Sequence, residues 1–302
     1  MPSLDTRSDL QAEFDSLRPG DSTEQGATRR TALKAAIGVG YAAATLPIAA
    51  QTAIKTPADG LKAGPIKYTV NGFEVPGYAA APAGKTGLPV VLVLQEIFGV
   101  HEYIADTCRR FAKAGYLAIA PELYARQGDP RNYTDIPKLQ AEIVSKVSDA
   151  QVIADLDGAL RYAAANGGDV NEAAITGFCW GGRFVWLYAA TGKVKAGVAW
   201  YGRLVGQASE MTPKHPIDVA ASLKAPVLGL YGGKDQGIPL DTVDKMKAAL
   251  ATGTPEAKAS QFVVYPEAGH AFHADYRPSY VREAAEDGWK RALAWLKTHG
   301  VA

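Results

Sequence analysis

The chain has 302 residues, of which 47% are hydrophobic and 21% charged, an ordinary composition for a soluble protein of one large domain or two small ones. Its formal net charge of +1 gives no bulk electrostatic reason to expect nucleic acid or an anionic membrane as a partner. Two cysteines exclude a disulfide framework, and the sequence has neither a Cys/His cluster with metal-ligand spacing nor a phosphate-binding Gly-Lys-Ser/Thr loop, so no metal or nucleotide cofactor is indicated.

The N-terminal part of the chain differs from the rest. The pair Arg29 and Arg30 precedes a stretch of small apolar residues at 35–50, which is short for a membrane span. This pattern is typical of a twin-arginine export signal, with cleavage after Ala50 or Ala53. We therefore expect residues 1–53 to be a removable extension, leaving an exported, periplasmic or secreted protein without a stable membrane span. The alternative is a basic linker and a buried helix in a cytoplasmic protein.

From about residue 60 onward, strand and helix patterns alternate. Asn71-Gly72 between two short alternating runs predicts a β-hairpin over residues 68–75 with a type I′ turn. The other predicted strands cover residues 90–94, 116–120, 173–177, 195–200, 226–231 and 261–265. The predicted helices cover residues 103–114, 138–147, 149–165 and 280–298. This alternation predicts an α/β fold over residues 60–302: a mainly parallel sheet with helices on both faces and an N-terminal β-hairpin.

The strongest motif is Gly-Phe-Cys-Trp-Gly at residues 177–181, between a short strand and a helix. It has the form of a strand-turn-helix elbow that exposes a nucleophile, with Cys179 where serine is commoner. The alternative is a buried structural cysteine, since unpaired cysteine is among the most buried residue types. Cys108 lies in a helical pattern and is expected to be a core thiol, although a Cys108–Cys179 disulfide stays open as an alternative.

An acid and a base follow the predicted nucleophile in chain order. Asp235 comes after the strand at residues 226–231, and His270 comes after the strand at residues 261–265. The order nucleophile, acid, histidine is that of the α/β-hydrolases. A base beside Cys179 would help to form the reactive thiolate, and a carboxylate would fix the tautomer of that base. His101, His215 and His299 lack such a context and are expected to be surface or helix residues.

Four segments together resemble the dienelactone hydrolases, also called carboxymethylenebutenolidases. They are Gln-Glu-Ile-Phe-Gly-Val at 95–100, Pro-Glu-Leu-Tyr-Ala-Arg-Gln at 121–127, Gly-Phe-Cys-Trp-Gly-Gly at 177–182, and Gly269-His270 with Phe272. The resemblance covers about residues 65–300. It implies the α/β-hydrolase fold, a triad of Cys179, Asp235 and His270, and no cofactor or metal.

The resemblance also implies further roles. Glu96 matches a glutamate that helps to convert the thiol into thiolate, and the backbone N–H groups of Ile97 and Trp180 match an oxyanion hole. Arg126 matches the first of two arginines that grip the substrate carboxylate, but Ala274 stands at the place of the second. The remaining candidates for lining the substrate site are Tyr124, His273, Tyr276 and Arg277, of which Arg277 is the candidate replacement for the missing arginine.

The expected function is hydrolysis of a small lactone or ester through a cysteine thioester. Because one arginine of the pair is missing, we expect a weaker preference for anionic lactones and more activity on neutral substrates than the family archetype shows. A general carboxylesterase or thioesterase on the same fold is the nearest alternative. A thiol-based redox protein is the alternative from another class.

Overall fold

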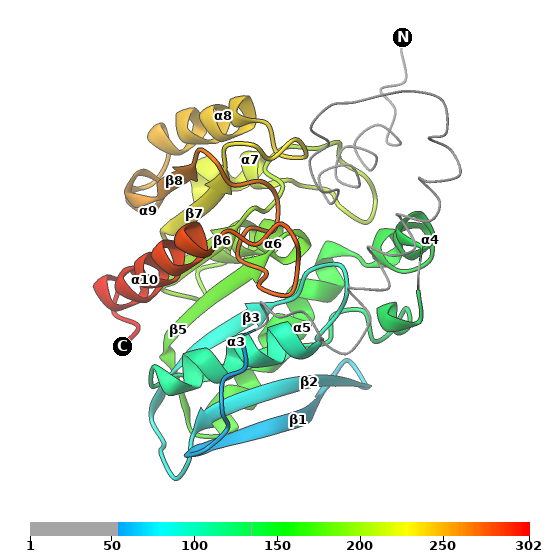
Figure 1. Ribbon diagram of the computed structural model, residues 1–302, viewed down its shortest axis with the longest axis vertical. Helices are drawn as coiled ribbons and strands as arrows, with labels where there is room; N and C mark the ends of the chain where they lie inside the picture. The colour runs from blue at the N-terminus through cyan, green and yellow to red at the C-terminus, as the bar shows by residue number, and fades with distance from the viewer. Residues whose placement is uncertain (1–53, 134) are drawn as a thin grey trace.

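The computed structural model describes residues 54–133 and 135–302, so the predicted extension at residues 1–53 lies outside the described residues. The described chain is built on one eight-stranded sheet with the order β1-β2-β4-β3-β5-β6-β7-β8 (Figure 1). From β4 to β8 every neighbouring pair of strands is parallel, whereas β1 and β2 join the sheet as antiparallel strands. The predicted α/β-hydrolase architecture is confirmed.

The N-terminal hairpin is longer than its prediction. Strands β1 (Leu61–Val70) and β2 (Phe73–Pro82) pair over their whole lengths. Asn71 and Gly72 both have positive φ, 50° and 80°, which confirms the type I′ turn. The outer half of β1 contains Gly64 and Pro65, which are poor strand formers that an edge strand tolerates.

Short apolar strands form the centre of the sheet. They are β3 (Leu88–Leu94), β4 (Leu117–Pro121), β5 (Gly168–Phe178), β6 (Ala196–Trp200), β7 (Val227–Gly232) and β8 (Gln261–Tyr265). Every residue of β4, β6 and β7 is buried, as expected for parallel strands that are covered on both faces. Residues that follow the carboxyl ends of these strands therefore gather at one edge of the sheet.

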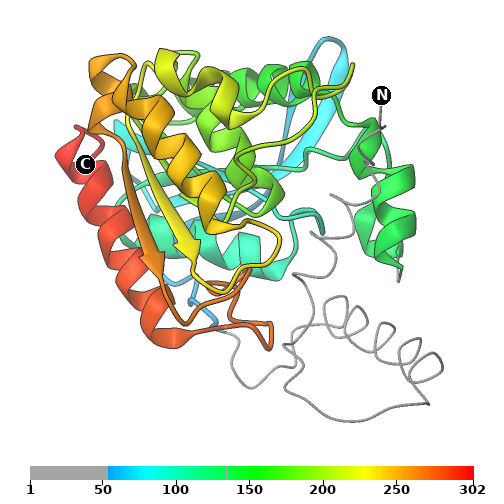
Figure 2. The same cartoon turned by 90° about the horizontal axis from the view of Figure 1, so that it is seen from above.

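Helices cover both faces. α3 (Glu102–Lys113) and α10 (Arg282–Thr298) lie on one face, and α5 (Asp149–Ala165), α6 (Trp180–Ala189) and α8 (Leu240–Ala251) lie on the other (Figures 1 and 2). The smaller helices are α4 (Ile136–Glu142), α7 (Pro216–Val219) and α9 (Pro255–Ala259), with 3₁₀ turns at Pro130–Asn132, Val144–Lys146 and Ala220–Ser222. In the part of the chain that the structure describes, no helix is long and apolar enough to cross a membrane.

One predicted helix is wrong in its extent. The single helix expected at 138–147 is instead α4 followed by the separate 3₁₀ turn at Val144–Lys146. Asp135 caps α4 by accepting a hydrogen bond from the Lys138 N–H at 2.8 Å, so the helix starts two residues earlier than predicted. Ile143 then departs from helical geometry, with φ −117° and ψ −69°, and ends it.

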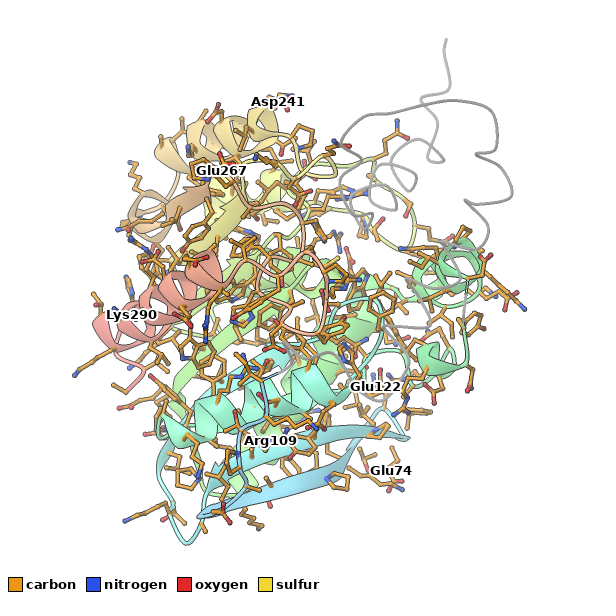
Figure 3. All side chains as sticks on the ribbon, in the orientation of Figure 1. Glu74, Arg109, Glu122, Asp241, Glu267 and Lys290 are labelled. Carbon is orange, nitrogen blue, oxygen red and sulfur yellow. The ribbon has the colours of Figure 1, made fainter. Side chains whose placement is uncertain are left out.

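The segment that precedes β1 is fixed to α3. Thr56 donates from its backbone N–H and its hydroxyl to Asp106, and its carbonyl accepts a hydrogen bond from Arg109. Arg109 lies on the side of α3 that faces the hairpin, where it also donates to the Tyr78 hydroxyl (Figure 3). These contacts join the start of the described chain to the helix that follows the first parallel strand.

Candidate active site

Cys179 lies at the sharp turn between β5 and α6. Its backbone has φ 53° and ψ −115°, a conformation that a residue with a side chain rarely adopts. The Cys179 N–H donates to the Trp200 carbonyl at 3.0 Å, which fixes the turn against the end of β6. Cys179 is 3% exposed and, like Cys108, is not in a disulfide. The backbone is therefore strained at the residue that the sequence singles out as the nucleophile.

Glycines allow the segments around this turn to approach one another closely. A Cβ on Gly177 would lie 2.4 Å from the Gly181 carbonyl oxygen, and one on Gly181 would lie 2.5 Å from the Gln95 carbonyl oxygen. Gly182 and Gly202 face each other in the same way: a Cβ on Gly202 would lie 2.2 Å from the Gly182 carbonyl carbon. All of these neighbours are backbone atoms, so no side-chain movement would make room for a larger residue.

Asp235 and His270 form a buried pair at the same edge of the sheet. Asp235 follows β7, and its Oδ1 accepts hydrogen bonds from the N–H groups of Gly237 and Ile238 at 3.0 and 3.2 Å. Its Oδ2 lies 2.7 Å from Nδ1 of His270, and the two side chains are 0% and 2% exposed. With Nδ1 donating to the carboxylate, Nε2 of His270 remains available as a base.

The charge of Cys179 acts on His270. Burial alone would lower the pKa of His270, but the charges of Asp235 and Cys179, together with the hydrogen bond to Asp235, raise it well above its ordinary value. The ring of Tyr201, which has a positive φ of 39°, contacts the His270 ring edge-on at 5.1 Å. Cys179, His270 and Asp235 thus come together from three separate strand ends.

Glu96 lies in the loop after β3 and is 1% exposed. The hydroxyl of Tyr276 donates to its Oε2 at 2.8 Å, and Nη1 of Arg277 lies 3.8 Å from its Oε1. Nε2 of His101 lies 3.9 Å from Oε2 on another side. A buried carboxylate is therefore surrounded by one hydroxyl, one guanidinium and one imidazole.

Arg277 is a cation largely withdrawn from water. Its side chain is 11% exposed, and its guanidinium lies over the rings of Phe98 and Tyr276, at 5.0 and 5.7 Å from the ring centres. Burial alone would lower its pKa, but the charges of Tyr276, Glu96 and Cys179 raise the pKa above its ordinary value. Arg277 therefore stays charged and sits within electrostatic reach of Cys179.

The two predicted oxyanion-hole donors come from segments that touch. Trp180 is the first residue of α6, so its N–H has no acceptor within the helix. The Gly181 N–H donates to the Gln95 carbonyl at 3.1 Å, which ties the start of α6 to the segment that carries Glu96 and Ile97. The fold thus ties the start of α6, where Trp180 lies, to the segment after β3 in which Ile97 lies.

Three other candidates from the sequence lie in different surroundings. Arg126 donates to both carboxylate oxygens of Asp155 on α5, at 2.6 and 2.9 Å, so its guanidinium is held in an ion pair with that helix. Tyr124 is buried with its ring 4.8 Å from that of Trp180, the residue after Cys179. His273 is 2% exposed, and its Nδ1 lies 2.6 Å from the Tyr103 hydroxyl.

His273 belongs to an aromatic cluster beneath the site. Its ring lies 5.3 Å from that of Phe178 and 4.3 Å from that of Trp200. Burial and the charge of Arg110 lower the pKa of His273 well below its ordinary value, so the ring is neutral at neutral pH. Its contacts support the packing of the loop that carries His270.

His101 was expected to be a surface or helix residue, but it lies beside Glu96. Gly99, with φ 75°, turns the chain after β3, so that His101 returns to the side of Glu96. The spacing of five residues across a glycine turn was the available signal. His215 is the N-cap of α7, so it lies at a helix end as expected, but it is only 5% exposed, with Nε2 at 2.9 Å from the Gln207 carbonyl. His299 follows α10 and contacts the Trp295 carbonyl, as expected for a residue at a helix end.

The sequence is similar to known proteins over most of its length. A protein-family model described as "Dienelactone hydrolase family" matches residues 75–300. A "Putative carboxymethylenebutenolidase" from Methylorubrum extorquens is 58% identical over 277 residues, which are 91% of this chain and 94% of that protein. A protein of the same name from Escherichia coli K12 is 54% identical over 263 residues, 86% of this chain and 96% of that protein.

A solved structure is also similar to this chain, in both sequence and fold. The crystal structure described as a "Putative Dienelactone Hydrolase" from Klebsiella pneumoniae has a TM-score of 0.76 and 57% sequence identity to this chain. The match covers 78% of this chain and 98% of the Klebsiella chain.

Proposed function

The chain belongs to the dienelactone hydrolase family, and from that premise we propose that it hydrolyses a lactone or carboxylic ester through a thioester formed on Cys179. The observation that carries the proposal is the arrangement at the elbow: a strained, buried cysteine beside a histidine that a carboxylate holds at 2.7 Å. A thiolate, an oriented base and backbone donors at a helix start are the parts that acyl transfer requires.

In the acylation step, Glu96 takes the proton of the Cys179 thiol: the S–H bond breaks and an O–H bond forms. The thiolate then attacks the substrate carbonyl carbon, and the N–H groups of Ile97 and Trp180 stabilise the oxyanion of the tetrahedral intermediate. Collapse of this intermediate breaks the carbonyl–oxygen single bond. In a lactone the leaving oxygen stays attached to the acyl chain.

In the deacylation step the acylated sulfur carries no charge, so one of the two charges that raise the pKa of His270 is gone. Nε2 of the neutral ring then takes a proton from water, which attacks the thioester carbonyl. The hydrogen bond from Nδ1 to Asp235 orients the ring and stabilises the imidazolium that forms. Collapse of the second tetrahedral intermediate breaks the carbon–sulfur bond, and the sulfur recovers its proton from Glu96. The leaving oxygen takes the proton held by His270, so the products are the carboxylic acid, the alcohol group and the regenerated thiol. No change in oxidation state occurs in either step.

For the substrate we propose a small ester or lactone whose carboxylate, where it has one, binds Arg277. The support is the position of Arg277, a charged guanidinium beside Glu96 and Cys179. Arg126 gives no such support, because Asp155 already occupies both of its terminal nitrogens. With one guanidinium rather than two, the preference for anionic lactones is modest and neutral esters remain substrates.

The alternatives predict different behaviour. A general carboxylesterase or thioesterase would share the two steps but gain nothing from a carboxylate on the substrate. A thiol-based redox protein would not require an acid and a base in this arrangement. The pairing of His270 with Asp235, within electrostatic reach of Cys179, therefore favours hydrolysis.

The test uses the purified, reduced full chain with a nitrophenyl ester and an unsaturated five-membered lactone. We expect turnover of both, loss of both after alkylation of Cys179 by iodoacetamide, and an acyl adduct on the Cys179 peptide in acid-quenched mass spectra. Hydrolysis that continues after complete alkylation would contradict the thioester. Absence of turnover, with reversible oxidation of Cys179, would favour the redox alternative.

A further inference from the structure

His101 lies beside Glu96 and has no part in the two steps proposed above. It immediately precedes α3, and its ring contacts Tyr103 at 5.9 Å, Tyr276 at 4.9 Å and Phe98 at 6.4 Å. Its Nε2 is inaccessible to solvent and has no hydrogen-bond partner among the described residues. That nitrogen is instead 3.9 Å from Oε2 of Glu96. A buried ring nitrogen without a partner is unusual and requires a reason.

The groups that face His101 keep its ring neutral. They come from four segments: Glu96 after β3, Tyr103 on α3, Arg131 in the 3₁₀ turn Pro130–Asn132, and Tyr276 with Arg277 in the loop after β8. Burial lowers the pKa of His101 to about 4, because the repulsion from Arg277 and Arg131 adds to desolvation and the attraction of Glu96 only partly offsets them. At neutral pH the imidazole is therefore one donor and one acceptor.

The other two neighbours of Glu96 are donors directed at its charged form. The Tyr276 hydroxyl donates to Oε2, and the guanidinium of Arg277 has donors and no acceptor. When Glu96 takes the thiol proton it becomes a donor, and neither of these groups offers it an acceptor while they keep their present roles. A protonated acid left without a partner in a buried site would return its proton to the sulfur.

We propose that His101 supplies this acceptor: in the tautomer with hydrogen on Nδ1, its Nε2 accepts a hydrogen bond from protonated Glu96 and holds the acid away from Cys179. The proposal rests on the thioester mechanism above. Closing 3.9 Å to a hydrogen-bond distance requires a movement of about 1 Å, which rotation of the Glu96 carboxyl group can supply. His101 is thus a positioning residue that acts through Glu96, and no bond to substrate is made or broken on it.

The experiment measures the acylation rate as the burst of nitrophenolate release over a range of pH. His101→Phe keeps the ring and removes the acceptor, and we expect acylation to slow about tenfold, the effect of one lost hydrogen bond. His101→Gln keeps an acceptor at similar reach and should restore most of the rate. His299→Phe, a change at the end of α10, is the matched control and should acylate at the parental rate.

A double-mutant cycle separates this role from packing. In a Glu96→Gln background, His101→Phe should cause no further loss, because the group through which His101 acts is absent. A loss of the same size in that background, or a parental rate and pH profile for His101→Phe alone, would overturn the inference. Should His101→Phe fail to fold by near-ultraviolet circular dichroism, His101→Asn, whose side chain is too short to reach Glu96, should show the same tenfold loss.

Cys179→Ala is measured alongside so that the two proposals fail separately. A burst from Cys179→Ala would overturn the thioester mechanism, whatever the behaviour of the His101 variants. No burst from Cys179→Ala together with parental acylation by His101→Phe would overturn the role of His101 alone.

Discussion

The guanidinium of Arg126 donates to both carboxylate oxygens of Asp155, at 2.6 and 2.9 Å, and lies 4.4 Å from the centre of the Phe73 ring. Asp155 is completely buried on α5. This pair ties the segment after β4 to a helix and to the hairpin. The fold therefore engages the Arg126 guanidinium in an ion pair, whereas the motif suggests that it binds a substrate carboxylate.

We predict that Arg126→Ala lowers the free energy of unfolding by about 2 kcal/mol, because the change leaves a buried carboxylate without its partner. Burial raises the pKa of Asp155 and the Arg126 bond opposes this rise, so the loss of stability should be smaller at acid pH, where the unpaired carboxyl group is protonated. Urea unfolding at several pH values measures it. Arg282→Ala, which breaks an exposed pair with Glu286, is the control and should cost about 0.5 kcal/mol or less. An increased KM confined to carboxylate-bearing substrates, with unchanged stability, would contradict this view of Arg126.

Cys179→Ala should reduce hydrolysis of a nitrophenyl ester by about 10⁴-fold or more, because the covalent intermediate is no longer available. Cys108→Ala is the matched control. Cys108 is completely buried in α3, where burial raises the pKa of its thiol, so it is an unreactive core residue. Its replacement should leave kcat/KM within about twofold and cost only packing energy. Parental turnover by folded Cys179→Ala would place the chemistry elsewhere.

Asp235→Asn should preserve the fold and lower kcat by about 10³- to 10⁴-fold. The asparagine oxygen can keep the hydrogen bonds from the Gly237 and Ile238 N–H groups, but its NH₂ group would face Nδ1 of His270 and force the wrong tautomer. Steady-state kinetics with a nitrophenyl ester, beside circular dichroism, measure both effects. A fall of less than about tenfold would show that Asp235 does not orient the base.

The same variant tests a pH dependence of stability. Burial opposes protonation of His270, but the charges of Asp235 and Cys179 prevail and its folded pKa lies well above the unfolded value. The folded state therefore binds this proton more tightly, and the resulting stabilisation is complete below about pH 6.5 and is lost as the pH rises through the raised pKa. Asp235→Asn should destabilise the protein more at weakly acid pH than at alkaline pH, as measured by urea unfolding. Equal losses at both would contradict the charge argument.

Arg277→Ala should lower kcat/KM for a carboxylate-bearing lactone by about 10- to 100-fold, the effect of one charged hydrogen-bonding pair, and change it much less for the matching neutral lactone. The measurement compares the two lactones on the parent, Arg277→Ala and Arg126→Ala. We expect the last to resemble the parent. A carboxylate advantage that persists in Arg277→Ala would show that another group binds the anion.

Replacing both Arg29 and Arg30 by lysine should retain the uncleaved precursor in the cytoplasm, because the export receptor recognises the arginine pair rather than its charge. Fractionation of cells followed by immunoblotting measures the distribution. Normal export of the double variant would contradict the twin-arginine route, and uncleaved protein in the membrane fraction would indicate an anchor instead.

Local sequence signals predicted most of the fold. The helix at Asp149–Ala165 and the strand at Gln261–Tyr265 have the predicted limits. Ser148 caps the helix, and the strand is a short run of β-branched and aromatic residues. The hairpin was underestimated, since Gly64 and Pro65 hide the outer half of its first strand. The sequence predicted one helix for α4 and the 3₁₀ turn after it because Ile143, where α4 ends, is neither glycine nor proline and gives no helix-end signal.

Some positions in the candidate site could likewise be predicted from the sequence, and others could not. Cys179 is preceded by a strand and followed by a helix, so its position could be predicted from local order. The pairing of Arg126 with Asp155, and the return of His101 to Glu96, depend on how distant segments pack, and no local pattern contains that information. A hydrogen-bonded ion pair with a residue 29 positions away determines the surroundings of Arg126.

The mutual contact of Gly182 and Gly202 has a consequence for the ways in which this sequence can change. A side chain at either position would collide with the backbone of the other, and the obstacle is the main chain, which is present whatever residue occupies the facing site. No second substitution can therefore compensate for the first, as a smaller neighbour compensates for a larger one in an ordinary core. Both positions therefore accept only glycine. Sequence variation near Cys179 is expected in the surrounding loops and not at these two glycines.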